Sequence, residues 1–263
     1  METVTWRFLG SSPAPGPRQM AIDDALLTLC GQGQSPPTLR LFSFRPPCLS
    51  LGRFQPAQAL DGLQVVRRPT GGRAVLHRGD ICYSVVAPAN HPLVAGSIRQ
   101  SYQKIARALA EGLAILGLSP LRPAFARSRP PGTAWCFDAV APYELTLNGA
   151  KLVGSAQVRR HGALLQQGSI RLAPDGRGQS IEEVLGRRLQ RREVAQALVE
   201  GFARAWGVDF RPGRLSAEEE ELAQRLEGER YADAAWTWWD STKGNDSSCR
   251  AYGHQQDNLT SRP

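Results

Sequence analysis

One short segment, RRPTGGRAVLH from Arg67 to His77, constrains the fold more than any other part of the chain. Apolar residues flank it, LQVV before it and ICYSVV after it, so the pattern predicts a strand, a glycine turn, a second strand, a short turn and a third strand. The adjacent Gly71 and Gly72 let the backbone approach a ligand without a Cβ in the way. An ordinary β-hairpin with a solvated basic turn is the alternative. The coincidence of glycines, cations and apolar strands favours a ligand-facing loop.

The composition is that of an ordinary globular protein. Of the 263 residues 41% are hydrophobic and 21% charged, no apolar run approaches the roughly 20 residues of a membrane span, and the start of the chain lacks a signal-peptide pattern. The five cysteines follow no zinc or redox spacing, which predicts a reducing, cytoplasmic location and no metal site. The net charge of +8 suits an acidic partner. Because no nucleic-acid-binding motif is visible, we expect an acidic protein and neither nucleic acid nor membrane.

Helices and strands are expected over residues 1–240, as a single domain. Residues 241–263 hold almost no apolar side chain and are predicted to form a disordered tail. The apolar pattern over 17–31 predicts an amphipathic helix, on which Asp23 and Asp24 are interpreted as solvated carboxylates. The other expected elements are strands over 38–44, 48–52 and 163–172, a helix capped by Ser97, and helices that begin with capping boxes at Ser180 and Ser216.

Cys136 is the strongest candidate for a nucleophile. It follows a basic, proline-rich loop over 121–135, and a hairpin that the Asn148-Gly149 pair predicts comes after it and carries Lys151. A free thiol has a pKa of about 8.5, so a nearby cation is needed to make it nucleophilic at neutral pH. Lys151 is the natural candidate for that cation. The alternatives are that Cys136 is a small buried hydrophobe and that Lys151 is an inert surface lysine.

Several long motifs resemble the lipoate–biotin protein ligase superfamily and, more narrowly, its cysteine-dependent octanoyltransferases. The motifs are QMAIDDALL, PPTLRLFSFRPPCLSLGRFQ, RRPTGGRAVLH, GDICYSVV and NGAKLVGSAQVRRHGALLQQGSI. The likeness extends from about Arg18 to Trp236. It implies an α/β (α+β) fold with a mixed β-sheet flanked by helices, like the catalytic domain of biotin and lipoate protein ligases.

The same resemblance implies a function in lipoate biosynthesis. In such enzymes a cysteine accepts an octanoyl group from acyl carrier protein as a thioester and passes it to the lysine of a lipoyl domain, in the glycine cleavage H protein or the E2 subunit of a 2-oxoacid dehydrogenase. No cofactor is implied. By their positions in the motifs, Cys136 matches the nucleophile and Lys151 the active-site lysine. The residues expected to bind substrate are Arg68, Thr70, Gly71, Gly72, Arg73, Ala74, His77, Gly154, Ser155 and Ala156.

One departure from the motif and three alternatives stay open. Where many relatives read Gln-His-Gly-Ser, this chain has Gln at position 167, which weakens any role for a histidine in that strand. An ATP-dependent lipoate–protein ligase has no need of a cysteine nucleophile, so Cys136 favours the transferase. An amidotransferase that moves the acyl group between lipoyl domains through a cysteine is closer in mechanism. A non-enzymatic lipoyl-domain binder requires Cys136 and Lys151 to be incidental. Arg122, Arg127 and Arg129 are predicted to face the acidic carrier.

Overall fold

The computed structural model describes residues 4–57, 60, 62–119, 121–123, 135–138, 144–147, 149–175 and 179–239. The predicted tail over 241–263, and Arg127 and Arg129 of the basic loop, lie outside these ranges, and nothing is described of the side chain of Arg122. The assignment of one domain to residues 1–240 therefore stays a prediction. Within the described ranges, no helix combines the length and the apolar character needed to cross a membrane.

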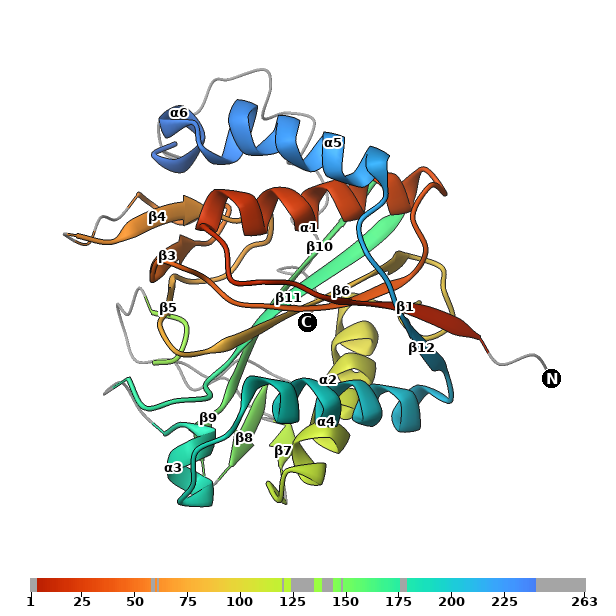
Figure 1. The fold of residues 1–263 in the computed structure, drawn as a ribbon, viewed down its shortest axis with the longest axis vertical. Helices are drawn as coiled ribbons and strands as arrows, with labels where there is room; N and C mark the ends of the chain where they lie inside the picture. Colours follow the sequence, from red (N-terminus) through yellow and green to blue (C-terminus); the bar gives the residue numbers. More distant parts are fainter. Residues whose placement is uncertain are drawn as a thin grey trace, which may run out of the picture.

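A mixed β-sheet lies at the centre of the protein, which confirms the predicted fold class (Figure 1). Strand β1 runs parallel to β2 and β12, whereas the remaining neighbours pair in antiparallel fashion. In the described part of the chain the strand order is β10 (Val153–Arg160), β11 (Ala163–Ile170), β6 (Ile81–Pro88), β2 (Thr38–Phe42), β1 (Thr5–Gly10) and β12 (Asp209–Pro212).

Helices cover both faces of this sheet (Figure 1). One layer holds α1 (Gly16–Gly31) and α5 (Ala217–Leu226), and the other holds α2 (Ile98–Ile115) and α4 (Arg191–Trp206). Because side chains alternate along a strand, Val85 of β6 packs toward α2 and α4 while Val86 packs toward α1. Both helical layers therefore pack against the same run of apolar residues in β6.

The predicted helix starts are confirmed. Ser97, Ser180 and Ser216 each accept a hydrogen bond from the backbone of the residue three positions later, and the side chain of that residue bonds back to the cap. These capping boxes begin α2, the short helix α3 (Ile181–Leu185) and α5. Beyond α5 the chain continues as a π-helical turn, η1 (Glu227–Tyr231), and ends its described part with α6 (Ala234–Thr237).

The strands expected around the glycine turn are present, but they are not partners of each other. In the second sheet the order is β4 (Gln64–Arg67), β3 (Cys48–Leu51) and β5 (Val75–His77), so β3 lies between the two strands that the turn joins. The turn therefore crosses the end of β3, just beyond which Gly52 sits. A Cβ on Gly52 would lie only 1.9 Å from the carbonyl oxygen of Gly72, so this crossing needs glycine.

A third sheet joins the lysine-bearing hairpin to the main sheet. Its strands are β7 (Arg122–Pro123), β8 (Leu145–Leu147) and β9 (Ala150–Lys151), and β8 pairs with β9 in antiparallel fashion, as the predicted hairpin requires. The return strand then leaves this sheet at Leu152 and continues as β10 in the main sheet. Lys151 consequently lies at the junction between the two sheets.

The interpretation of Asp23 and Asp24 as solvated carboxylates is wrong, because both are fully buried. Asp23 forms an ion pair with the equally buried Arg40, with 2.6 Å between Oδ1 and the guanidinium. Asp24 accepts hydrogen bonds from the hydroxyl of Tyr231 (2.8 Å) and the guanidinium of Arg230 (2.7 Å). These partners come from β2 and η1, which pack against the face of α1 that the sequence-based prediction left exposed to solvent.

Candidate active site

Cys136 is held between the end of the glycine turn and the lysine hairpin. Its backbone N–H donates to the carbonyl oxygen of Ala74 (2.9 Å). Lys151 Nζ donates to Cys136 Sγ at 3.3 Å and to the Cys136 carbonyl oxygen at 2.7 Å. Gly154 lies so close that a Cβ there would be 3.0 Å from Sγ. Residues that are distant in sequence thus converge on one half-buried thiol.

The other described cysteines are held in their neutral form. Burial raises the pKa of Cys30 to about 11 and that of Cys48 to about 12, and it raises the pKa of Cys82 well above its ordinary value. All three are buried, whereas Cys136 is partly exposed. Since the thiolate is the nucleophilic form, Cys136 is the best candidate nucleophile among the cysteines that the structure describes.

Glu144 is part of this site, although the sequence-based reasoning did not select it. Its Oε2 lies 2.7 Å from Lys151 Nζ, and both side chains are almost entirely buried. The carboxylate and the backbone carbonyl oxygen of Cys136 therefore direct the lysine ammonium toward Sγ. The available signal was a carboxylate on the same predicted hairpin as Lys151, two residues before Thr146, which is the residue that pairs with Lys151. A buried charge needs a partner of opposite charge.

Replacing Lys151 by methionine is expected to slow alkylation of Cys136 by iodoacetamide at neutral pH. The ammonium lies 3.3 Å from Sγ, where it attracts the negative charge of the attacking sulfur, and the neutral methionine side chain cannot do this. The variant also leaves Glu144 buried without its cation, so the melting temperature should fall. Adding Glu144→Gln should restore much of the stability but not the alkylation rate.

Intact mass against time measures the alkylation, and Lys104→Met, at an exposed position of α2, is the matched control. An unchanged alkylation rate in Lys151→Met would show that the ammonium does not act on the thiol.

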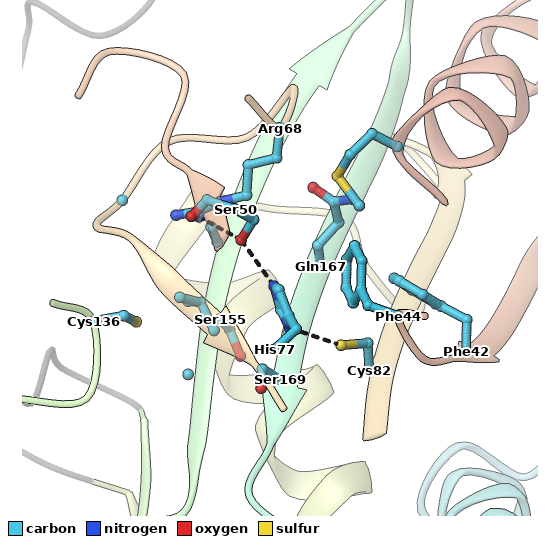
Figure 2. A pocket seen from close by; sticks show the side chains of 16 residues that line it. Phe42, Phe44, Ser50, Arg68, His77, Cys82, Cys136, Ser155, Gln167 and Ser169 are labelled. Carbon is cyan, nitrogen blue, oxygen red and sulfur yellow. Dashed lines mark hydrogen bonds between the residues drawn. The ribbon is translucent and has the colours of Figure 1, made fainter. Parts of the chain in front are cut away.

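A cavity extends from Cys136 into the protein (Figure 2). Figure 2 shows Cys136 at one side of this cavity and Phe42, Phe44 and Cys82 at the opposite side, with His77 and Ser155 between them. Most of the lining is carbon, so the cavity suits an apolar chain attached at the thiol. Of the residues that the sequence assigned to substrate binding, those that line it are Arg68, Gly72, His77, Gly154, Ser155 and Ala156.

Arg68 shapes the glycine turn from inside. Its guanidinium donates to the carbonyl oxygens of Gly71 (2.6 Å) and Arg73 (2.8 Å) and to that of Ser50 (3.0 Å). Burial lowers its pKa, and none of these partners is a carboxylate. His77 Nε2 lies 2.8 Å from Ser50 Oγ, and its ring stacks on Phe44 with 4.0 Å between centroids. Arg68 and His77 thus contact neighbouring protein groups in addition to lining the cavity.

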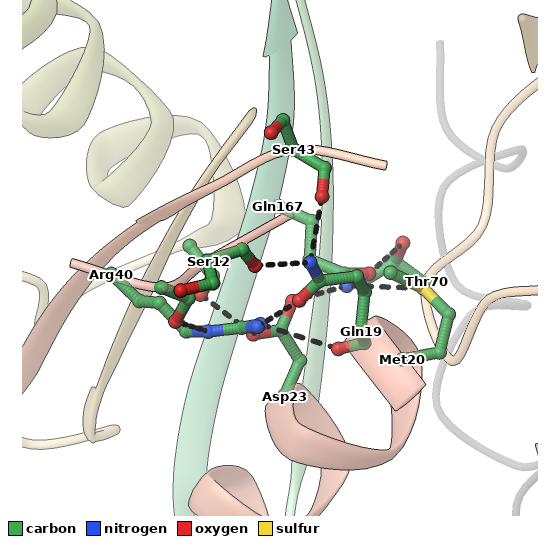
Figure 3. Close-up of polar contacts among 10 residues, drawn as sticks. Ser12, Gln19, Met20, Asp23, Arg40, Ser43, Thr70 and Gln167 are labelled. Atoms are coloured by element: carbon green, nitrogen blue, oxygen red, sulfur yellow. Dashed lines mark hydrogen bonds and ion pairs between the residues drawn. The ribbon is translucent and has the colours of Figure 1, made fainter. Parts of the chain in front are cut away.

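Other predicted binding residues do not line this cavity. Gly71 faces open space and Arg73 is half-buried, while Ala74 lines a neighbouring cavity that also reaches Cys136. Thr70 is buried, and its hydroxyl donates to Gln167 Oε1 at 2.8 Å (Figure 3). Gln167 also donates to Asp23, so it ties the turn to the buried polar groups of α1.

His77, Asp80 and Cys82 place their ligand-type atoms within 4.8 Å of one another in the described part of the chain. These atoms bond to each other: Asp80 Oδ2 is 2.6 Å from His77 Nδ1 and 3.3 Å from Cys82 Sγ. Burial disfavours the Asp80 carboxylate, but the imidazole and the hydroxyl of Ser169 outweigh burial, so the pKa of Asp80 lies below its ordinary value. The hydrogen bonds account for this cluster, and we assign it no metal.

A sheet covered by helices on both faces thus carries a cysteine that lines a mostly apolar cavity and contacts a buried lysine. The sequence matches the lipoyl protein ligase A/B catalytic domain over residues 15–178. The chain belongs to this family and is an acyltransferase.

Curated relatives of similar length carry a narrower name. The octanoyltransferase LipM of Moorella thermoacetica is 40% identical over 271 residues, covering 90% of this chain and 98% of that protein. The octanoyltransferase LipM of Kyrpidia tusciae is 38% identical and covers 87% and 97%. Among solved structures, a lipoate-protein ligase A bound with ATP superposes with a TM-score of 0.75 at 24% identity, over 90% of this chain and 99% of that one. This structural likeness concerns the fold alone.

Proposed function

We propose that the protein is an octanoyltransferase that carries its acyl group on Cys136. The contact that best supports this proposal is the 3.3 Å approach of Lys151 Nζ to Cys136 Sγ at the mouth of the apolar cavity. The donor is octanoyl-acyl carrier protein, and the acceptor is the lysine of a lipoyl domain, in the glycine cleavage H protein or a 2-oxoacid dehydrogenase E2 subunit. The names of the relatives support the octanoyl group.

The reaction has two halves. Cys136 attacks the carbonyl carbon of the donor thioester, the donor thiol departs with the proton that Cys136 loses, and an octanoyl thioester remains on Sγ. The acceptor lysine, as a free amine, then attacks the same carbon and forms the amide. The proton that its nitrogen loses goes to the departing sulfur, which restores the Cys136 thiol. Exchange between thioesters is nearly balanced and aminolysis is downhill, so ATP is not needed.

This chain supplies positioning and charge. Holding the thioester beside the attacking group can contribute about 7–11 kcal/mol of the barrier. The tetrahedral intermediate needs donors for its oxyanion, each worth about 2.7–4 kcal/mol. The Lys151 ammonium and the backbone N–H groups around Gly72 are the groups we assign to this task.

The test is the mass of the wild-type protein after incubation with octanoyl-acyl carrier protein without ATP. We expect one added octanoyl group, released by neutral hydroxylamine, and its appearance on a lipoyl domain when that domain is added. Modification that requires free octanoate and ATP would identify a ligase instead. Acylation by an octanoylated lipoyl domain, but not by the carrier protein, would identify an amidotransferase.

A further inference from the structure

A second cavity meets the first one at Cys136. The first cavity runs inward from the thiol, whereas the second is lined by Leu76 of β5, by the loop of Trp135 and Phe137, and by Arg171. Val75 and Cys136 line both cavities. A thioester carbon bonded to Sγ at their junction can therefore direct its acyl chain into one cavity and its leaving group into the other.

One wall of the second cavity is a strand edge. In the described residues β5 is an outer strand of its sheet, and its inner side pairs with β3. Just before β5, the outer edge is bridged at Ala74 by Trp135. The carbonyl oxygen of Ala74 points away from β3, because it accepts the N–H of Cys136. Since backbone groups alternate along a strand, the N–H and carbonyl of Leu76 also point away from β3, on the side of the second cavity.

The remaining walls combine aromatic and charged groups. The Arg171 guanidinium lies 4.9 Å from the centroid of the Phe137 ring and pairs with Asp175. Arg171 is itself 5% exposed, so its charge belongs to the cavity wall and not to the outer surface. Asp138 and Asp175 also line this cavity, so the charge of Arg171 is balanced by carboxylates. The wall therefore offers backbone hydrogen-bonding groups, an aromatic face and paired charges, which suits an extended, uncharged chain that contains amides.

We propose that the second cavity binds the pantetheine arm of the thioester donor, an extended thiol with two amide groups. The inference rests on the proposed function, since it places the leaving group of the first half-reaction. An amide of the arm pairs with the outer edge of β5 at Leu76, as an added strand would. The side chain of an acceptor lysine carries no amide, so it would leave the hydrogen-bonding groups of this edge unused.

The test compares two donors in the first half-reaction. S-octanoyl-pantetheine carries the arm, and S-octanoyl-mercaptoethanol lacks both amides. For the wild-type protein we expect the second-order rate constant of Cys136 acylation to be about tenfold higher with the first donor, since each hydrogen bond contributes about three- to tenfold. Leu76→Pro removes the N–H at the outer edge and should reduce this ratio several-fold toward one. Proline is tolerated where the missing N–H faces away from the ladder.

Leu76→Trp, which fills the cavity by its side chain, is the second variant and should reduce the ratio in the same way. Ile115→Trp, at an exposed position of α2, is the matched control and should keep the wild-type ratio. Equal rates with both donors in the wild-type protein, or an undiminished ratio in a folded Leu76 variant, would overturn the proposal.

Two further outcomes are distinct. If Leu76 variants slow octanoyl transfer from preformed acyl-enzyme to a lipoyl domain but not acylation itself, the cavity serves the acceptor and the proposal is wrong. If neither donor acylates the wild-type protein, the proposed octanoyltransferase function is itself wrong.

Discussion

Cys136→Ala is expected to abolish octanoyl transfer from carrier protein to a lipoyl domain, with a loss on the order of a thousandfold or more, as for other nucleophiles that form covalent intermediates. No other described thiol can take over, because burial keeps Cys30, Cys48 and Cys82 protonated. Cys136→Ser should either be inactive or accumulate an octanoyl ester that neutral hydroxylamine does not release. A serine hydroxyl is far less ionised than a thiol at neutral pH, and its ester is a poorer acyl donor than a thioester.

The control for this experiment is Cys30→Ala, which removes a thiol in the layer between α1 and the sheet, away from the cavity. Its transfer rate should match that of the wild-type protein. Mass spectrometry of the acyl-enzyme and a discontinuous assay of octanoylated lipoyl domain together measure both halves of the reaction. Wild-type transfer by Cys136→Ala would exclude a cysteine-bound intermediate.

Elements that depend on neighbouring residues could be predicted from the sequence. The helix that follows Ser97 and the one that follows Ser216 are specified by capping residues three positions apart and by an apolar stripe. The hairpin around Gly149 follows from turn chemistry in the same way. These sequence signals are local, so they can be recognised without knowledge of the rest of the fold.

The pairing of the strands around the glycine turn could not be predicted in this way. A short turn between two apolar runs indicates a hairpin, yet β3 inserts between β4 and β5. That insertion depends on Gly52, where any Cβ would collide with the carbonyl of Gly72. A single glycine after a strand does not reveal which distant carbonyl it must accommodate.

The candidate site, like the fold, could be predicted from the sequence only in part. Cys136 and Lys151 stood out because a thiol after an irregular loop is followed closely in sequence by a hairpin that carries a cation, and the structure brings Sγ and Nζ within 3.3 Å. Glu144 did not stand out, because its role exists only through its contact with Lys151 across the hairpin. Gln167 bridges Thr70 and Asp23, and the residue type alone does not indicate this role.

Asp23 lies at the centre of a buried polar network that joins α1 to the glycine turn (Figure 3). Its Oδ1 accepts from Arg40 (2.6 Å) and from the hydroxyl of Ser84 (2.8 Å), and its Oδ2 accepts from Gln167 Nε2 (2.6 Å). Burial lowers the pKa of Arg40, and the Asp23 carboxylate is the charge that opposes this effect. A single side chain therefore neutralises a buried guanidinium and, through Gln167, orients Thr70.

Asp23→Ala is expected to reduce the free energy of unfolding by about 3–5 kcal/mol, since it leaves the fully buried charge of Arg40 without its partner. At about 2–4 °C per kcal/mol for a chain of this size, the melting temperature should fall by roughly 10 °C. Asp209→Ala, at an exposed position of β12, should change stability by about 0.5 kcal/mol at most.

In the double variant Asp23→Ala/Arg40→Met the buried charge is gone as well, so its loss of stability should be clearly smaller than the sum of the two single losses. Denaturant unfolding of the wild-type protein, of Asp23→Ala, Arg40→Met and Asp209→Ala, and of the double variant measures these differences. Additive losses, or a cost below about 1 kcal/mol for Asp23→Ala, would show that the ion pair does not hold α1 against the sheet.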